Sequence, residues 1–286
     1  MRCDVLMVQA DPLELVSEAQ RAWWSRLGEI AQAVGARAWL VGGPVRDLLL
    51  GCQCPDTDLA VEGDVEALAQ AMAAELGGRV RKTTQFMTAT VALPSGEAID
   101  LAHTRTEVYP KPGALPTVAA AGLEEDLARR DFTVNAMAVA LNPDQFGRLV
   151  DPHGGRADLQ ARLLRVLHER SFEDDPTRLL RAARFAYSLG LELEEHTAEL
   201  MGRAVAERRL LTISRARVRN ELRRLFADLP GTALEALQRW ELTHALGWPA
   251  APERALARSR ELPRAAQALG LTVAQLQPLP ASLGLY

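Results

Sequence analysis

A strand-like segment, a glycine pair, a proline and an arginine follow one another in this sequence, and together they could bind a phosphate group. Residues 37–41 are mostly apolar, and Gly42 and Gly43 follow them directly. Pro44 then stands where a helix would begin, a position that needs no backbone N–H donor. The amides of a helix start attract an anion, glycine lets the backbone approach it, and Arg46 adds a charge-assisted contact. The stretch therefore predicts a phosphate cradle.

Two aspartates, Asp56 and Asp58, follow this stretch closely. Residues 58–61 have the composition of a strand, so the two side chains are expected on the same face of it. Carboxylate oxygens are the ligands that Mg²⁺ prefers in proteins. Each feature alone has an ordinary explanation, because a glycine pair is usually a turn and an isolated Asp-x-Asp is usually a helix cap or a solvated loop. In combination they predict a metal site beside a phosphate site.

These residues also resemble a known signature. Leu40-Val-Gly-Gly-Pro-Val-Arg-Asp-Leu-Leu-Leu-Gly51, followed by Pro55-Asp-Thr-Asp-Leu59, is similar to the signature of polymerase-β-like nucleotidyltransferases. The closest resemblance is to the class II tRNA nucleotidyltransferase and bacterial poly(A) polymerase family, whose members extend RNA 3′ ends without a nucleic acid template. It implies a mixed α/β (α+β) chain, with a polymerase-β-like catalytic domain followed by an all-helical neck and body. It assigns nucleotide binding to Gly42, Gly43, Arg46 and Asp47.

Residues 97–105 form the first of three downstream segments that arrive in the order typical of the family. Their alternation of apolar and polar residues predicts a strand, on which Asp100 would join Asp56 and Asp58 as a third catalytic, metal-binding carboxylate. The other interpretation of Asp100 is an aspartate at a strand end or turn.

Residues 123–138 form the second segment and resemble the family block Arg-Arg-Asp-Phe-Thr-x-Asn-Ala nearly residue for residue. The resemblance implies that Arg130 contacts phosphate. Two interpretations of Arg129, Asp131 and Asn135 stay open. In one, Asn135 belongs to the nucleotide-binding set, and in the other these side chains hold the fold together by hydrogen bonds.

Residues 171–185 form the third segment. Counting from Pro176 as a helix start with Asp175 at its N-cap, an arginine recurs every third residue on one side of the helix, at Arg178, Arg181 and Arg184. Periodicity alone predicts a surface helix with a solvated cationic stripe. The resemblance implies instead that Asp175 and Arg178 read the Watson–Crick edge of the incoming base, and it adds the other two arginines to the nucleotide-binding set.

The resemblance implies a complete reaction. Mg²⁺ held by the carboxylates would activate the 3′-hydroxyl of an RNA for in-line attack on the α-phosphorus of CTP or ATP, and pyrophosphate would leave. The expected substrate is the 3′ end of tRNA. Addition of CCA, of CC alone or of A alone all stay open, and the last two require a complementary enzyme in the same cell. The alternatives are a poly(A) polymerase that uses ATP only and a non-catalytic nucleotide- or RNA-binding relative.

The composition sets broader limits. A chain of 286 residues with 48% hydrophobic content and no long apolar run predicts about two domains and no membrane span. Nothing resembles a signal peptide, and three cysteines predict no disulfide framework, so a cytoplasmic protein is expected. The net charge of −4 argues against an RNA partner, but residues 203–224 contain eight arginines and only two acidic residues. This stretch predicts either an RNA-binding face or a solvated pair of amphipathic helices.

Four regions are expected along the chain, and the oligomeric state is not predicted. They are a helical lead-in at 1–27, a catalytic domain at 28–142, a helical neck at 143–226 and a short helical body and tail at 227–286. Residues 105–118 occupy the place of the loop that, in the family, switches addition from C to A, and three prolines would stiffen this loop here.

Overall fold

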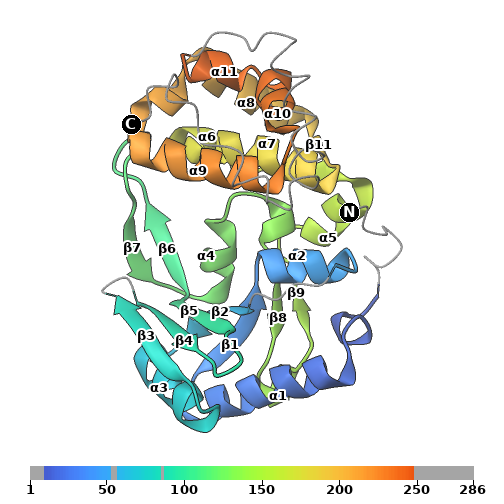
Figure 1. Ribbon diagram of the computed structural model, residues 1–286, viewed down its shortest axis with the longest axis vertical. Coiled ribbons are helices and arrows are strands. Elements are labelled where there is room, and N and C mark those ends of the chain that lie inside the picture. Colours follow the sequence, from blue (N-terminus) through green and yellow to red (C-terminus); the bar gives the residue numbers. More distant parts are fainter. Residues whose placement is uncertain (1–9, 53–56, 85–86, 248–286) are drawn as a thin grey trace, which may run out of the picture. The chain divides into compact units, whose positions relative to one another are not determined.

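The structure, a computed structural model, describes residues 10–52, 57–84 and 87–247, except for the side chains of residues 82–84 (Figure 1). The chain divides into two units. The first contains the chain through Val108 together with Pro116–Ala161, and the second contains Tyr109–Leu115 and the chain from Arg162 onward. The tail expected near the end of the chain, and Asp56 of the candidate site, lie outside the described residues.

The first unit is built on a seven-stranded mixed sheet with the order β3-β4-β5-β2-β1-β8-β9. Only β2 and β5 pair in parallel, and all other neighbours are antiparallel. The strands are β1 (Arg37–Val41), β2 (Thr57–Glu62), β3 (Arg79–Thr84), β4 (Thr88–Ala92), β5 (Ala98–His103), β8 (Ala138–Ala140) and β9 (Leu149–Val150). A separate two-stranded ribbon pairs β6 (Arg105–Val108) with β7 (Thr117–Ala120).

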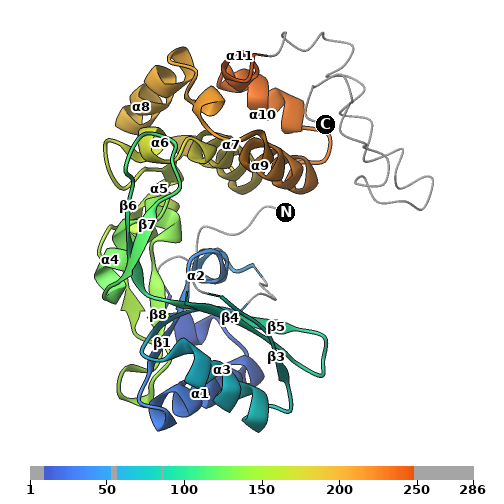
Figure 2. The same ribbon diagram turned by 90° about the vertical axis from the view of Figure 1, so that its left-hand side faces the viewer.

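Helices α1 and α3 pack together against the sheet, with α2 on its other side (Figure 2). Side chains at the N-caps begin two of these helices: Ser17 accepts from the backbone of α1, and Asp64 accepts from two amides of α3 at 2.9 and 3.0 Å. The helices of this unit are α1 (Glu18–Ala33), α2 (Gly43–Leu49), α3 (Val65–Glu75), α4 (Leu123–Ala128) and α5 (Gly155–Ala161), with 3₁₀ turns η2 (Pro12–Glu14), η3 (Thr133–Asn135) and η4 (Pro143–Gln145).

The expected boundary between the catalytic domain and the helical neck, between residues 142 and 143, falls within the first unit. Residues 143–161 stay with the sheet because β9 pairs with β8 and α5 packs against η3. The lead-in helix also differs from the expected bounds, since α1 begins at Glu18 and runs on to Ala33. Trp24 of α1 is a core residue with 3% exposure, whereas Trp23 is half-buried.

The second unit is helical, as the expected neck and body require, apart from one short parallel pair of β10 (Leu163–Leu164) and β11 (Glu192–Leu193). Helix α7 packs against α9 and α10. The left-handed Gly190, with φ +64°, ends α7, and Ser214 caps α9. The helices are α6 (Ser171–Asp174), α7 (Thr177–Leu189), α8 (Glu195–Ala206), α9 (Arg215–Asp228), α10 (Ala233–Arg239) and α11 (Leu242–Ala245), with the 3₁₀ turn η5 (Arg209–Thr212).

Two expectations from composition can be compared with the structure. Within the described part of the chain, no helix has the length and apolar character needed to span a membrane. Cys52 takes part in a disulfide bond, which the count of three cysteines did not predict.

Gly28 allows a close backbone contact between α1 and the residue that follows β8, which gives a test of the packing. A Cβ at this position would lie 1.8 Å from the carbonyl oxygen of Leu141, a backbone atom that cannot rotate away. We therefore expect Gly28→Ala to lower the free energy of unfolding by about 3 kcal/mol, measured by urea denaturation. Gly202→Ala in α8 is the matched control, because no atom lies within 4 Å of its Cβ. It should be neutral or stabilise by up to about 1 kcal/mol. Equal effects of the two substitutions would contradict this packing.

Candidate functional site

The glycine turn has the conformation and surroundings of a close-approach site. Gly42 adopts φ +73° and ψ −128° as the N-cap of α2, and Pro44 lies in the first turn of that helix, as the sequence predicts. A Cβ at Gly42 would lie 2.8 Å from Nη1 of Arg130. The backbone conformation therefore favours glycine at this position, and a side chain here would displace the guanidinium of Arg130.

Arg46 is held beside this turn by two polar neighbours. Its side chain is buried, with Nε donating to the carboxylate of Asp47 at 2.8 Å and Nη1 donating to Oδ1 of Asn135 at 2.6 Å. Asn135 in turn donates to Asp131 at 3.0 Å. These contacts fit the interpretation in which Asn135 and Asp131 hold the fold together, and they show that the amide of Asn135 orients a guanidinium. A contact of any of these residues with a nucleotide stays a prediction.

Asp126 is the residue that holds Arg130, and the sequence reasoning missed it. The carboxylate has 1% exposure and accepts from Nη2 of Arg130 at 2.8 Å and from Nη2 of Arg129 at 2.6 Å. The spacing provides a signal that could have found it, because residues three and four apart on a helix are neighbours. Burial acts to raise the pKa of Asp126, but the guanidiniums of Arg130 and Arg129 outweigh it and lower the pKa below its usual value.

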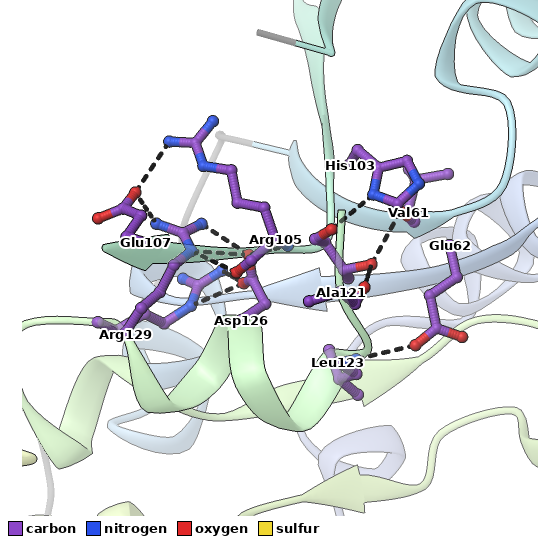
Figure 3. A network of polar contacts seen from close by, with 11 residues as sticks. Val61, Glu62, His103, Arg105, Glu107, Ala121, Leu123, Asp126 and Arg129 are labelled. Carbon is purple, nitrogen blue, oxygen red and sulfur yellow. Dashed lines mark hydrogen bonds and ion pairs between the residues drawn. The ribbon is translucent and has the colours of Figure 1, made fainter. Parts of the chain in front are cut away.

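The network around Asp126 extends to the two-stranded ribbon (Figure 3). Arg129 also donates to Glu107 on β6 at 2.8 Å and to the carbonyl of Arg105 at 3.1 Å. The backbone N–H of Arg105 donates to Asp126 at 3.3 Å. The start of the expected switching loop is therefore attached to α4 and to Arg129 at the C-terminal end of this helix, while residues 109–115 of the loop belong to the second unit.

The two described carboxylates of the expected metal site lie on neighbouring strands. Asp58 on β2 and Asp100 on β5 are directly paired in the parallel register, so both project from the same face of the sheet, and both are exposed. Thr90 on β4 donates to Asp100 at 2.5 Å. Among the described residues, no three acidic, histidine or cysteine side chains form a metal-binding group. The oxygen donors of Asp58 and Asp100 suit Mg²⁺, and Asp56 is outside the described residues.

In the second unit, the predicted cap is shifted by one residue. Helix α7 starts at Thr177 with Pro176 as its N-cap, because Asp175 is extended at φ −130° and ends α6. The carboxylate of Asp175 still accepts from the Thr177 amide at 2.9 Å. It also accepts from Nη2 of Arg217 at 2.7 Å, a contact that the sequence reasoning missed.

The three arginines of α7 do not form the solvated stripe that periodicity alone predicts. Arg178 is 4% exposed and donates through Nη1 to Ser171 at 2.7 Å and to His168 at 3.3 Å. Arg181 and Arg184 are half-buried, because they face acidic side chains of α9: Arg181 lies 3.9 Å from Glu221, and Arg184 lies 2.7 Å from Asp228. Arg178 therefore stands apart from the other two, which tie α7 to α9.

The arginine-rich stretch at 203–224 is partly paired within the second unit. Arg217 donates to Asp175 and, at 2.9 Å, to the carbonyl of Gly113 in the expected switching loop. Arg224 bonds Glu221 at 2.7 Å, and Arg209 bonds Glu207 at 2.6 Å. Four other arginines of the stretch are exposed, namely Arg203, Arg208, Arg215 and Arg223. An RNA-binding face remains a prediction for these.

Comparison with known proteins identifies relatives of this chain. The model of the poly A polymerase head domain matches residues 38–165. The A-adding tRNA nucleotidyltransferase of Halalkalibacterium halodurans is 41% identical over 245 residues, which are 82% of this chain and 57% of that protein. The CC-adding tRNA nucleotidyltransferase of Deinococcus radiodurans is 39% identical over 223 residues, which are 77% of this chain and 58% of that protein. The chain thus spans a little over half the length of these two relatives.

A solved structure shares the fold as well as the sequence. The apo form II of a CCA-adding enzyme is 35% identical, with a TM-score of 0.83 over 91% of this chain and 63% of that one. The mixed sheet, the glycine turn and the carboxylates on β2 and β5 define a polymerase-β-like nucleotidyltransferase domain, and a helical region follows it in the sequence. The chain belongs to the family of class II tRNA nucleotidyltransferases and bacterial poly(A) polymerases.

The buried carboxylate of Asp126 gives a test of the site's architecture. Asp126→Asn leaves the shape but removes the charge between two arginines, so we expect the free energy of unfolding at pH 7 to fall by about 3 kcal/mol. Because the folded-state pKa is lowered, the stabilisation by Asp126 is fully present above the usual pKa of 3.8 and is lost as the pH falls through the lowered value.

Urea denaturation of both proteins across this range measures the effect. The stability difference between wild type and variant should shrink as the pH falls below 3.8. Glu29→Gln is the control, since its ion pair with Arg26 is exposed and should contribute little. A difference that stays constant with pH would contradict this account of the charge network.

Proposed function

We propose that this protein is an enzyme that adds C, A or both to the 3′ end of tRNA, using CTP or ATP and releasing pyrophosphate. The observation that carries this proposal is the convergence of Arg46 and Arg130 on the glycine turn. Both guanidiniums are oriented by neighbours before any ligand binds, which favours an electrostatic role at the triphosphate. The names of the two relatives as tRNA nucleotidyltransferases support the tRNA substrate.

In the proposed reaction, Asp58 and Asp100, with Asp56, would hold Mg²⁺. When bound, the metal would promote loss of the proton of the RNA 3′-hydroxyl and neutralise the triphosphate. The amides at the start of α2, together with Arg46 and Arg130, would bind the charged oxygens of the leaving pyrophosphate. The pairing of Asp58 and Asp100 across neighbouring strands supports a shared ligand, since it presents two hard oxygen donors from one face.

Base selection is proposed for Asp175 and Arg178. A carboxylate accepts a hydrogen bond from the exocyclic amine of cytosine or adenine, and a guanidinium donates to a ring nitrogen or a carbonyl oxygen. Both side chains are held by others, Asp175 by Arg217 and Arg178 by Ser171, which supports a role that depends on orientation. UTP and GTP present the opposite pattern of donors and acceptors and would be rejected.

The number of nucleotides added remains part of the proposal, as do the cellular context and the RNA-binding surface. An enzyme that adds only CC or only A would work with a complementary enzyme in the same cell, and we place this activity in the cytoplasm.

The exposed arginines of residues 203–224 would contact RNA phosphates, so tRNA binding should weaken as salt rises. The matched head-domain model also favours one second candidate, a poly(A) polymerase that takes only ATP.

Extension of defined tRNA transcripts tests the proposal. Transcripts that end before CCA, after the first C and after CC are incubated with the full chain, Mg²⁺ and CTP, ATP or both, and product lengths are read on a gel. Growth limited to CCA, CC or A supports the proposal and identifies the product. A long ATP-only ladder would favour poly(A) polymerase, and no extension in any mixture would contradict an enzymatic function for this chain.

Carboxylate variants test the proposed metal site in the same assay. Asp58→Asn and Asp100→Asn should each lower the extension rate at least about a hundredfold, because the ligand charge is lost while the shape is retained. Asp144→Asn is the matched control, since its carboxylate is exposed in the same unit and pairs with the exposed Arg37 at 3.6 Å. Full activity of both site variants would contradict their assignment.

A further inference from the structure

His168 has a contact with Arg178 that depends on its protonation state. The imidazole lies in the turn that leads from β10 to α6 and is half-buried, with Nε2 at 3.3 Å from Nη1 of Arg178. A guanidinium can only donate, so Nε2 must be the acceptor. The contact therefore requires the neutral imidazole with its proton on Nδ1.

Ser171 completes the arrangement around the same nitrogen. Its side chain is fully buried, and its Oγ accepts from Nη1 of Arg178 at 2.7 Å. The backbone N–H of Ser171 donates to the carbonyl of His168 at 3.1 Å, which fixes the turn. Because Nη1 carries two hydrogens, Ser171 and His168 together take both of them. Nη1 is thus held by two acceptors from the same turn.

We propose that His168 is a positioning residue for nucleotide selection: its neutral imidazole orients Arg178 toward the base, and protonation of the ring abolishes this orientation. The inference rests on the proposed base-reading role of Arg178. A protonated ring would direct an N–H at the N–H of Arg178 and would place two positive charges at hydrogen-bonding distance. The contact would change from attractive to repulsive.

The surroundings of His168 keep the ring neutral at neutral pH. Burial lowers the pKa of His168, the guanidinium of Arg178 lowers it further, Asp174 acts to raise it, and Arg170 acts to lower it. Asp174 is itself paired with Arg170 at 2.9 Å, which limits its influence on the ring. Because the pKa lies below the usual 6.5, the contact is present at pH 7 and is lost as the pH falls through the lowered value.

Steady-state kinetics of the full chain with tRNA test this inference. The ratio of kcat/KM for the correct nucleotide to that for UTP or GTP is measured from about pH 5 to about pH 8 for wild type, His168→Gln and His168→Leu. His168→Gln keeps a neutral acceptor, so it should retain selectivity and lose the decline at acid pH. His168→Leu lacks the acceptor, so it should select about tenfold less well at all pH values.

His196→Gln is the matched control, because His196 is exposed in the same unit and pairs with Glu169 and Glu199. It should keep the wild-type pH profile. Unchanged selectivity and an unchanged profile in His168→Leu, together with lost selectivity in Arg178→Lys, would overturn the role of His168 and leave the proposed function intact. Unchanged selectivity in both variants would overturn base reading by Arg178 itself.

A spectroscopic measurement covers the case in which His168→Leu does not fold. Nitrogen chemical shifts of the wild-type imidazole should show an unprotonated Nε2 and a protonated Nδ1 at pH 7. The opposite tautomer, or a ring that is already protonated at this pH, would overturn the inference.

Discussion

A carboxylate with 1% exposure, that of Asp126, lies between the guanidiniums of Arg129 and Arg130, and both the glycine turn and the two-stranded ribbon depend on it. Burying this charge alone would be strongly unfavourable, and its two partners make the burial possible. The ion pairs fix Arg130 against Gly42, and Arg129 extends the network to the strand that begins the expected switching loop. One buried charge thus links Arg130, the proposed phosphate contact, to the start of the expected switching loop.

The second unit uses the same principle at the proposed base-reading residues. Asp175 is held by Arg217, and Arg178 is held by Ser171 and His168. In both units, the side chains proposed to contact the nucleotide are oriented by neighbours that need not touch it. Such preorganisation lowers the entropy lost on binding and keeps dipoles aimed where charge develops in the transition state.

Local signals in the sequence predicted the glycine turn, the helix start at Pro44 and the strands that carry Asp58 and Asp100, because these depend on residues close together in the chain. The contact of Arg217 with Asp175 was not predicted, since 42 residues separate them and no periodicity connects two different helices. The alternative from periodicity alone, a solvated stripe on α7, is wrong for a related reason: periodicity shows which side chains share a face, but the carboxylates of α9 decide whether that face meets water.

A double-mutant cycle in kcat/KM for nucleotide incorporation tests most directly whether Asp126 acts on the reaction through Arg130. Asp126→Asn, Arg130→Ala and the double variant are compared with wild type on one tRNA transcript. If Asp126 acts by holding Arg130, the double variant is no slower than Arg130→Ala alone. If the two losses simply add, Asp126 serves the reaction by another route, and the buried charge is not what positions the phosphate contact.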